Sequence, residues 1–465
     1  MSTLHTLYGP VVRISPNQLS YISASSWHSI YGVRGASPSH PQMLKEELEF
    51  PGEEFEFFAP AKPMISCNAG EHARQRRVVG LAFSERAVRG YEEVVGGMAG
   101  VLMGRLEAEQ RGVDERLKGG GGKGEGIDIM DWFHFAMFDI TSALVFGRAF
   151  GNMERGRYHE WVARVFPGMK LVTWSLAVTS VPGLGRVVSW LIPRKVVDEA
   201  RRHMQAIVDM TDARSRVQLT NPPHQPDFMS HILPPLQLPR GDESMTASLS
   251  TEELYLNSQL LCIAGSETTA SLLAGAVYFL ALRENARHRD RLVAEVRDQF
   301  ATAEDITPAS IALRAPFLCA VLNECLRLYP PGAINMPRTV PPGGAMIDGR
   351  YVPAGSVVGI AQFAAYRSAT HWIDPLKFAP ERWLDGEQGK YAGDRKEVFK
   401  PFSHGPRSCI GQSLAVAECR LIVARLFWEF DVHVLPGQED WVRQRTFLSW
   451  EKPPLMVHVR KAHRV

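Results

Sequence analysis

The segment from Ser250 to Arg283 is apolar on nearly every side of the helix that it predicts. Ser250 followed by Thr251 and Glu253 is typical of a helix start, with a capping hydroxyl and acidic residues in the first turn. At about 30 residues, the predicted helix is far longer than the average of about 11. A helix without a polar face must be surrounded by the rest of the protein. We therefore expect it to cross the core of a mainly helical protein.

Other helices and a few short strands are expected around it. An amphipathic helical pattern covers 128–150, and a second helix is expected over 315–329. A third helical pattern, over 411–430, is apolar on every side. Short strands separated by Pro and Gly turns are expected between Met346 and Ile360. No repeat is visible, and nothing divides the chain into separate cores. We predict a mainly α fold with a small β region, in a single catalytic domain over residues 1–465.

The composition excludes several other classes of protein. Hydrophobic residues make up 45% and charged residues 22%, which is ordinary for a folded soluble protein. The 52 basic and 50 acidic residues give a net charge of +2, so there is no overall basic surface for nucleic acid. The six cysteines contain no Cys-x-x-Cys pair, which argues against a disulfide framework. A zinc site through His404, Cys409 and Cys419 fails on ligand number and spacing.

One segment resembles a membrane span, and another resembles a dinucleotide-binding motif. The apolar stretch from Leu171 to Ile192 is interrupted by Pro182 and Gly183, so it predicts a pair of short helices rather than a membrane span. The glycines in 118–126 spell GxGxxG, but no hydrophobic strand precedes them as a dinucleotide site requires. We interpret that segment as a flexible loop.

A single cysteine lies just before the last apolar helix, in Phe402-Ser-His-Gly-Pro-Arg-Ser-Cys-Ile-Gly411. Gly405 and Gly411 permit backbone angles that let the loop fold tightly. The start of a helix favours the thiolate form of Cys409, and a thiolate is a suitable axial ligand for haem iron. Arg407 can pair with a haem propionate. The ordinary alternative is a free, buried cysteine.

The sequence Ala264-Gly-Ser-Glu-Thr-Thr269 interrupts the long apolar helix. Small and polar residues are locally unfavourable there and call for an explanation. A bond from the Thr268 hydroxyl to the Ala264 carbonyl would loosen the helix, and Gly265 would leave a small groove for dioxygen and water. Glu267 adds a titratable neighbour for proton delivery. The alternative is a helix crossing at a small residue, with a satisfied hydroxyl.

Glu324 and Arg327 lie three residues apart on one helix face. Alone, such a pair is usually a solvated surface ion pair. Arg382, in Pro380-Glu-Arg-Trp383, is equally unremarkable alone.

Together and in this order, these motifs resemble the cytochrome P-450 superfamily of haem-thiolate monooxygenases, from about Tyr8 to the C-terminus. The Cys409 loop fits the signature Phe-x-x-Gly-x-Arg-x-Cys-x-Gly at every fixed position. The resemblance implies the family's triangular, mainly helical fold, with Cys409 as the haem iron ligand. It implies that Glu324, Arg327 and Arg382 lock the core behind the haem. Segments such as Pro380-Glu-Arg-Trp-Leu384 are similar to those of filamentous-fungal members of the family that act in secondary metabolism.

The resemblance also assigns residues to the haem, the protons and the substrate. Implied haem-binding residues are His72, Arg76, Ala264, Gly265, Arg338, Phe402, Arg407, Cys409 and Gly411. Thr268 and Glu267 are implied to be catalytic, through proton delivery. Implied substrate-wall residues are Phe57, Phe58, Trp174, Leu260, Leu261, Ala333, Ile334, Asn335, Phe447 and Leu448. We expect Asn335 to orient the substrate, and ordinary core packing is the alternative for the whole set.

The implied reaction inserts one oxygen atom of O2 into a lipophilic small molecule such as a terpenoid, alkaloid or polyketide. It requires haem b and electrons from NADPH-cytochrome P-450 reductase, with cytochrome b5 as a further candidate donor, and the protein is expected to be a monomer. Basic residues that can receive the reductase are Lys396, Lys400, Arg407, Arg74 and Arg77, unless they are simply a solvated surface. Two alternatives are a haem-thiolate isomerase or dehydratase, and a non-catalytic haem-binding protein. The intact Gly265–Thr268 segment favours the monooxygenase.

Eukaryotic members usually carry a membrane-anchoring helix before a segment like Tyr8-Gly-Pro10, and this sequence starts at that segment. We expect the cytosolic face of the endoplasmic reticulum membrane if an anchor has been lost by truncation, and the cytoplasm otherwise.

Overall fold

The computed structural model describes residues 1–33, 42–45, 58–118, 126–179, 192–220, 225–233, 248–333 and 336–462. The long apolar pattern forms helix α12 (Thr251–Ala281), which ends just before the predicted end at Arg283. Its start is capped as predicted. The Ser250 hydroxyl accepts a hydrogen bond from the Glu253 amide at 3.1 Å, and the Glu253 carboxylate accepts one from the Ser250 amide at 2.9 Å. The predicted loop at 118–126 lies mostly outside the described residues.

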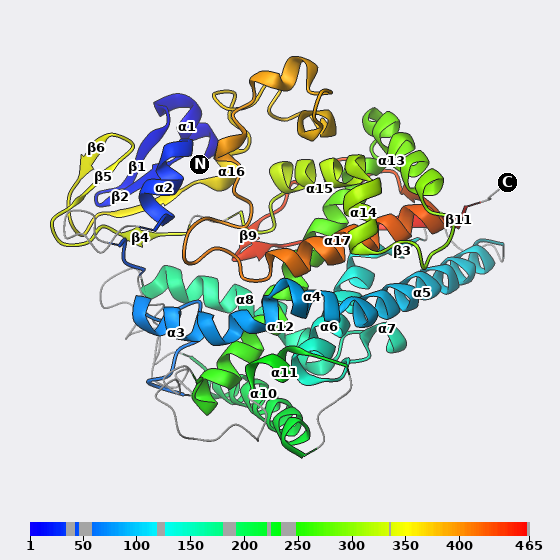
Figure 1. Cartoon of the computed structure of the whole chain (residues 1–465), viewed down its shortest axis with the longest axis horizontal. Coiled ribbons are helices and arrows are strands. Elements are labelled where there is room, and N and C mark those ends of the chain that lie inside the picture. Colours follow the sequence, from blue (N-terminus) through cyan, green and yellow to red (C-terminus); the bar gives the residue numbers. More distant parts are fainter. Residues whose placement is uncertain are drawn as a thin grey trace. The chain divides into compact units, whose positions relative to one another are not determined.

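Helices dominate the described chain (Figure 1). Besides α12 they are α1 (Ser2–Tyr8), α2 (Ala24–Tyr31), α3 (Ala69–Val79), α4 (Glu85–Gly90), α5 (Glu92–Lys118), α6 (Ile129–Phe146), α7 (Asn152–Arg155), α8 (Glu160–Thr179), α10 (Arg194–Thr220), α11 (Phe228–Ile232), α13 (Ala286–Gln299), α14 (Pro308–Arg314), α15 (Pro316–Leu328), α16 (Gln362–Ala365) and α17 (Gln412–Glu429). Short 3-10 helices cover Gly80–Phe83, Arg283–Asn285, Pro380–Trp383, Gly389–Gly393 and Lys396–Val398.

The described strands form small sheets, as predicted. A four-stranded sheet has the order β1 (Val11–Ser15), β2 (Gln18–Tyr21), β7 (Val357–Ile360), β4 (Arg338–Thr339). A three-stranded sheet has the order β3 (Ile127–Asp128), β11 (Met456–Lys461), β8 (Phe430–Val434). Two hairpins pair β5 (Ala345–Ile347) with β6 (Arg350–Val352), and β9 (Thr446–Phe447) with β10 (Ser449–Trp450). Strand β2 runs parallel to β7, and the other described strand pairs are antiparallel.

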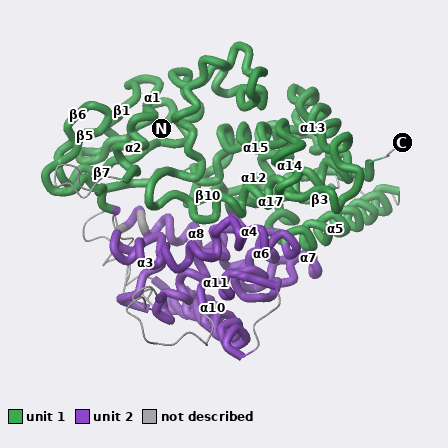
Figure 2. Tube along the Cα trace, in the orientation of Figure 1, with its two compact units in different colours: residues 1–44, 95–136, 268–465 green, residues 45–94, 137–267 purple. Residues whose placement is uncertain are grey.

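The chain divides into two compact units (Figure 2). Unit 1 comprises residues 1–44, 95–136 and 268–465 and holds all the described strands. Unit 2 comprises residues 45–94 and 137–267, and its described secondary structure is helical. Helices α5, α6 and α12 contain residues of both units. The single catalytic domain stays a prediction.

Helices α6 and α12 are long and apolar enough, by length and composition, to cross a membrane. In the structure, 89% and 72% of their most apolar windows are buried inside the protein, so core packing accounts for their apolarity. The prediction of an amphipathic helix over 128–150, with one polar face, is therefore wrong. Within α6 only Asp131 and Ala143 are half-buried, and the remaining side chains are buried.

Candidate functional site

The loop that carries Cys409 closes tightly on itself and on the end of α2. The Cys409 amide donates a hydrogen bond to the Phe402 carbonyl at 2.8 Å. Gly405 has φ +78°, and an added Cβ there would overlap the carbonyl oxygen of Tyr31. The prediction of a required glycine is therefore confirmed at Gly405. It is wrong at Gly411, because its φ of −85° suits any residue.

Cys409 is the exposed member of the six cysteines, none of which is in a disulfide. It lies just ahead of Gly411, the N-cap residue of α17, as predicted. The alternative of an ordinary buried cysteine is therefore wrong. An exposed thiol close to a helix N-terminus is chemically suited to act as a thiolate ligand.

Arg338, on β4, is a buried cation without an acidic partner among the residues that the structure describes. Its side chain is only 6% exposed, and its Nη1 donates to the neighbouring Pro337 carbonyl at 3.0 Å. No carboxylate of the described residues lies within ion-pair distance of its guanidinium. Burial lowers the pKa of Arg338, Tyr31 partly offsets this by raising it, and the positive charge of Arg407 lowers it further. Two neighbouring cations, one of them buried, favour an anionic ligand such as a haem propionate.

Helix α12 has an exposed strip at its centre. Ala264 and Thr268 are exposed and lie one turn apart on the same side, while the rest of the helix between Glu253 and Leu280 is buried or half-buried. Between Glu253 and Leu280, the helix is therefore accessible at its centre, at two side chains no larger than threonine. Glu267 is only 2% exposed and does not share this strip.

Gly265 has a different role from the one predicted. An added Cβ at Gly265 would lie 3.2 Å from Cγ2 of Thr141, so this glycine allows α12 to approach α6 closely. Nearby, the Ser266 hydroxyl donates to the carbonyls of Cys262 at 2.8 Å and Met137 at 3.2 Å. Gly265 therefore serves the close approach of two helices, and the groove beside Thr268 stays a prediction. Helix α12 continues unbroken through this segment.

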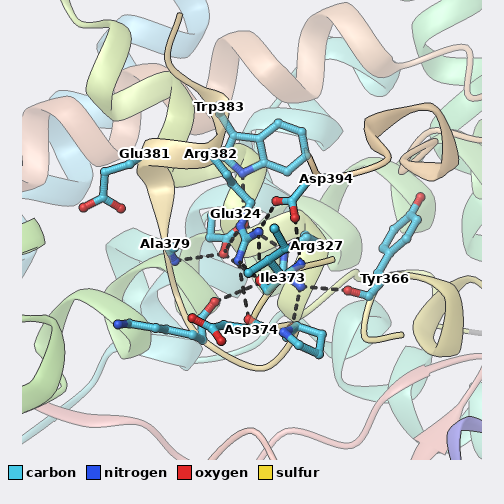
Figure 3. Close-up of polar contacts among 12 residues, drawn as sticks. Glu324, Arg327, Tyr366, Ile373, Asp374, Ala379, Glu381, Arg382, Trp383 and Asp394 are labelled. Atoms are coloured by element: carbon cyan, nitrogen blue, oxygen red, sulfur yellow. Dashed lines mark hydrogen bonds and ion pairs between the residues drawn. The ribbon is translucent and has the colours of Figure 1, made fainter. Parts of the chain in front are cut away.

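Glu324 and Arg327, both on α15, form a fully buried pair rather than a surface one (Figure 3). Arg327 Nε and Nη2 donate to the two carboxylate oxygens of Glu324 at 2.9 and 2.8 Å. The remaining Arg327 hydrogens reach backbone carbonyls of Tyr366, Pro375 and Lys377 at 2.6 to 3.0 Å. This one guanidinium therefore ties α15 to three points of the segment 366–377.

Arg382, in the 3-10 helix Pro380–Trp383, completes the cluster (Figure 3). Its Nε donates to Glu324 at 3.1 Å, and its Nη1 pairs with Asp394. The Ala379 amide and the Trp383 indole each donate to Glu324 at 2.9 Å. Burial raises the pKa of the Glu324 carboxyl, but Arg327 and Arg382 outweigh it and lower the pKa overall. Sequence reasoning missed Asp394, because nothing near it in the chain indicates a buried ion pair.

The other predicted residues are distributed over several elements. On α3, His72 is buried and Arg76, one turn later, is half-buried. Among the described substrate-wall residues, Leu261 is buried, while Phe58, Leu260, Ala333, Phe447 and Leu448 are half-buried. Trp174, on α8, is 65% exposed and is not enclosed in this structure. Phe57, Ile334 and Asn335 lie outside the described residues.

The basic residues predicted to receive a reductase differ in their surroundings. Arg77 is exposed, and Lys396, Lys400 and Arg407 are half-buried. Arg74 instead forms a bidentate ion pair with Glu253, with Nη1 3.0 Å from Oε2. The carboxylate of Glu253 is nearly buried, so this pair is part of the internal structure of unit 2.

Glu418, on α17, is a buried carboxyl that the sequence did not single out. It is 2% exposed, and Thr269 Oγ1 of α12 lies 3.5 Å from its Oε2. Burial raises the pKa of Glu418 to about 8. It lies in unit 1 and has no cationic partner among the described residues.

Glu418→Gln is expected to make the protein less sensitive to alkaline pH. A carboxyl whose pKa rises from 4.5 to about 8 on folding contributes stability below pH 4.5 that is lost as the pH rises towards 8. Since one pKa unit corresponds to about 1.4 kcal/mol, the variant should gain about 2 kcal/mol over the parent between pH 5.5 and 7.5. Chemical denaturation at both pH values measures this, and parallel pH dependences of variant and parent would contradict it.

Comparison with known proteins places this site in a family. The family model described as Cytochrome P450 matches residues 1–459. Cytochrome P450 monooxygenase astJ of Aspergillus oryzae is 36% identical over 460 residues, covering 98% of this chain and 85% of that protein. Cytochrome P450 monooxygenase atr2 of Stereocaulon alpinum is 35% identical over 462 residues, covering 98% and 83%. Cytochrome P450 monooxygenase cpaH of Aspergillus oryzae is 34% identical over 460 residues, covering 98% and 82%.

These matches confirm the predicted fold class and the resemblance to fungal members. They extend over nearly the whole chain, and the Cys409 loop lies within the matched range. The chain therefore belongs to the cytochrome P450 family, and it is a haem-dependent monooxygenase that incorporates oxygen from O2 with electrons from a redox partner.

Proposed function

We propose that this enzyme binds haem b through Cys409 and oxidises a lipophilic secondary metabolite of moderate size, such as a terpenoid, alkaloid or polyketide. NADPH-cytochrome P-450 reductase supplies the electrons, with cytochrome b5 as a further candidate. The observation that carries the proposal is the exposed Cys409 thiol, held ahead of α17 in a loop that closes on Tyr31.

The residues around the loop fit the charge of haem. Cys409 supplies the thiolate, while Arg338 and Arg407 supply guanidinium groups for a propionate. His72 and Arg76, one turn apart on α3, form the second propionate-binding set. When bound, the haem supplies the activation of dioxygen, which electron donation from a thiolate ligand favours.

On α12, the exposed strip of Ala264 and Thr268 is the part of the helix open to the haem and oxygen. The Thr268 hydroxyl can both donate and accept a hydrogen bond, so it can hold a water and pass a proton from it. Glu267 is the neighbouring titratable group, and its burial places it behind this strip rather than on it.

Thr268→Ala is expected to retain haem and substrate binding but to divert electrons from NADPH into hydrogen peroxide. The substitution removes the hydroxyl that holds the water, together with one methyl group of the exposed strip. The measurement is the ratio of product formed to NADPH consumed, with hydrogen peroxide assayed in parallel. Thr268→Ser restores a hydroxyl and should restore most of the coupling. Equal coupling in the Ala variant and the parent would refute this role.

The substrate is proposed to lie against apolar side chains, with Leu260 and Leu261 of α12 and Phe58 on the described part of the wall. Asn335 is the proposed polar anchor. Product analysis after feeding candidate metabolites to cells that express the enzyme with a reductase tests the function. Exchanging Asn335 should then shift the oxidised position or the substrate affinity. Absence of any oxidised product from lipophilic metabolites would contradict the proposed substrate class.

We propose in addition that the enzyme acts as a monomer at the cytosolic face of the endoplasmic reticulum, where Lys396, Lys400 and Arg407 receive the reductase. Complementary charge steers such encounters and makes them dependent on salt. Fractionation of the native host cells tests the location, and the salt dependence of reduction tests the docking.

A further inference from the structure

Tyr31, the last residue of α2, connects the parts of unit 1 that are proposed to hold the haem. It is 3% exposed and belongs to the hydrophobic core that covers β2 and β7. Its hydroxyl donates to the Met336 carbonyl at 2.7 Å and accepts a hydrogen bond from the Ile360 amide at 3.2 Å. These two bonds join α2 to strand β7 and to the backbone just before Arg338.

The ring and the backbone of Tyr31 make two further contacts. The guanidinium carbon of Arg338 lies 5.1 Å from the centre of the Tyr31 ring, a cation–π arrangement. The carbonyl oxygen of Tyr31 occupies the place where a side chain at Gly405 would be, so the Cys409 loop rests on it. A single buried residue therefore contacts both the candidate propionate cation and the candidate ligand loop.

The Arg338 side chain depends on the Tyr31 ring to hold its guanidinium in position. It is buried, it has no carboxylate partner among the described residues, and its Nη1 donates to the adjacent Pro337 carbonyl. A long, flexible side chain in this position is oriented mainly by the aromatic face next to it. The position of its charge is then set by the Tyr31 ring, and the ring is held mainly by its packing in the core, with the bonds to Met336 and Ile360 as an addition.

We propose that Tyr31 is a positioning residue, whose ring holds the Arg338 guanidinium in place for a haem propionate. This inference rests on the proposed haem-binding role of Arg338. It assigns Tyr31 no contact with the iron or the substrate. It predicts that losing the ring weakens the recognition of the propionate, whereas losing the hydroxyl alone matters less.

The test compares Tyr31→Leu and Tyr31→Phe in the haem-loaded enzyme, with Trp27→Leu as a matched control. Trp27 lies in the same helix and core and packs on Tyr31 with ring centres 5.3 Å apart, but no contact of it with Arg338 is described. The readouts are the rate of haem transfer to an excess of apomyoglobin, and the preference for haem over its dimethyl ester, which has no free propionates.

We expect Tyr31→Leu to release haem about tenfold faster, within the range of a partly buried cation–π contact, and to lose most of the preference for haem over the ester. Tyr31→Phe should remain within about twofold of the parent, because the ring persists. Trp27→Leu should keep the preference even if the fold is weakened. If Tyr31→Leu does not fold, Tyr31→Met serves in the same comparison.

A double-mutant cycle with Arg338→Leu separates positioning from general stability. If Tyr31 acts through Arg338, then Tyr31→Leu has no further effect on the preference once Arg338 is replaced. Additive effects, or a preference that Tyr31→Leu leaves unchanged, would overturn the inference. A parent enzyme that binds no haem would instead overturn the proposed function, so the two failures are distinguishable.

Discussion

Arg327→Ala abolishes soluble expression and haem incorporation, if the buried cluster around Glu324 has the role that its geometry indicates. Both side chains are 0% exposed, and Arg327 makes two of the hydrogen bonds to the carboxylate. Removing one partner of a buried ion pair costs about 3–5 kcal/mol, because a buried charge loses its compensation. Backbone carbonyls of the segment 366–377 lose their donors as well. Each buried carbonyl left without a donor costs about 1–3 kcal/mol more, so the combined cost is comparable with a total stability of about 5–15 kcal/mol and the variant should not fold.

The measurements are soluble yield, circular dichroism and haem content after expression with a haem precursor. Arg291→Ala is the matched control, because Arg291 pairs with Glu387 at 2.7 Å in an exposed position. Such pairs contribute at most about 1 kcal/mol, so the control should fold normally. Arg327→Lys should also fail, since an ammonium cannot reproduce the bidentate contact. An Arg327→Ala protein that folds, binds haem and merely reacts slowly would contradict the structural role.

Cys409→Ala should remove the red-shifted Soret band of the reduced, CO-bound enzyme and abolish monooxygenation. The band requires a thiolate ligand, and a methyl group cannot bind iron. The thiol is exposed, so its loss removes little buried apolar area and the apoprotein should unfold at nearly the same denaturant concentration. Spectra of the reduced CO complex and denaturant titration measure the two effects.

Cys67→Ala and Cys319→Ala are matched controls for Cys409→Ala. Cys67 is buried and Cys319 is half-buried. Both variants should keep the spectrum of the parent, whatever small loss of stability the cavity at Cys67 causes. A Cys409→Ala protein with the spectrum of the parent would disprove the ligand assignment.

Long-range partners account for most of what the sequence did not predict at the site. The sequence pointed to Glu324, Arg327 and Arg382, but alone they had the spacing of surface charges. Burial of the cluster depends on Asp394 and Trp383, which reach it only through the folded path of the segment that follows Arg382. Tyr31 likewise contacts the backbone 305 positions away along the chain, a relation that no local pattern carries.

The sequence by itself determined the longest core helix and the loop around Cys409, because both depend on nearby residues. The apolar residues on all sides of α12 and the cap at Ser250 favour the helix through neighbours only a few turns away. The tight loop before Cys409 requires Gly405. Only the tertiary structure decided which distant residues those elements contact. It placed Thr141 against Gly265, left Ala264 and Thr268 as the exposed strip, and set the Tyr31 ring beside Arg338. Those contacts join distant segments whose packing is chosen by the fold as a whole, so no periodicity or spacing in one segment specifies them.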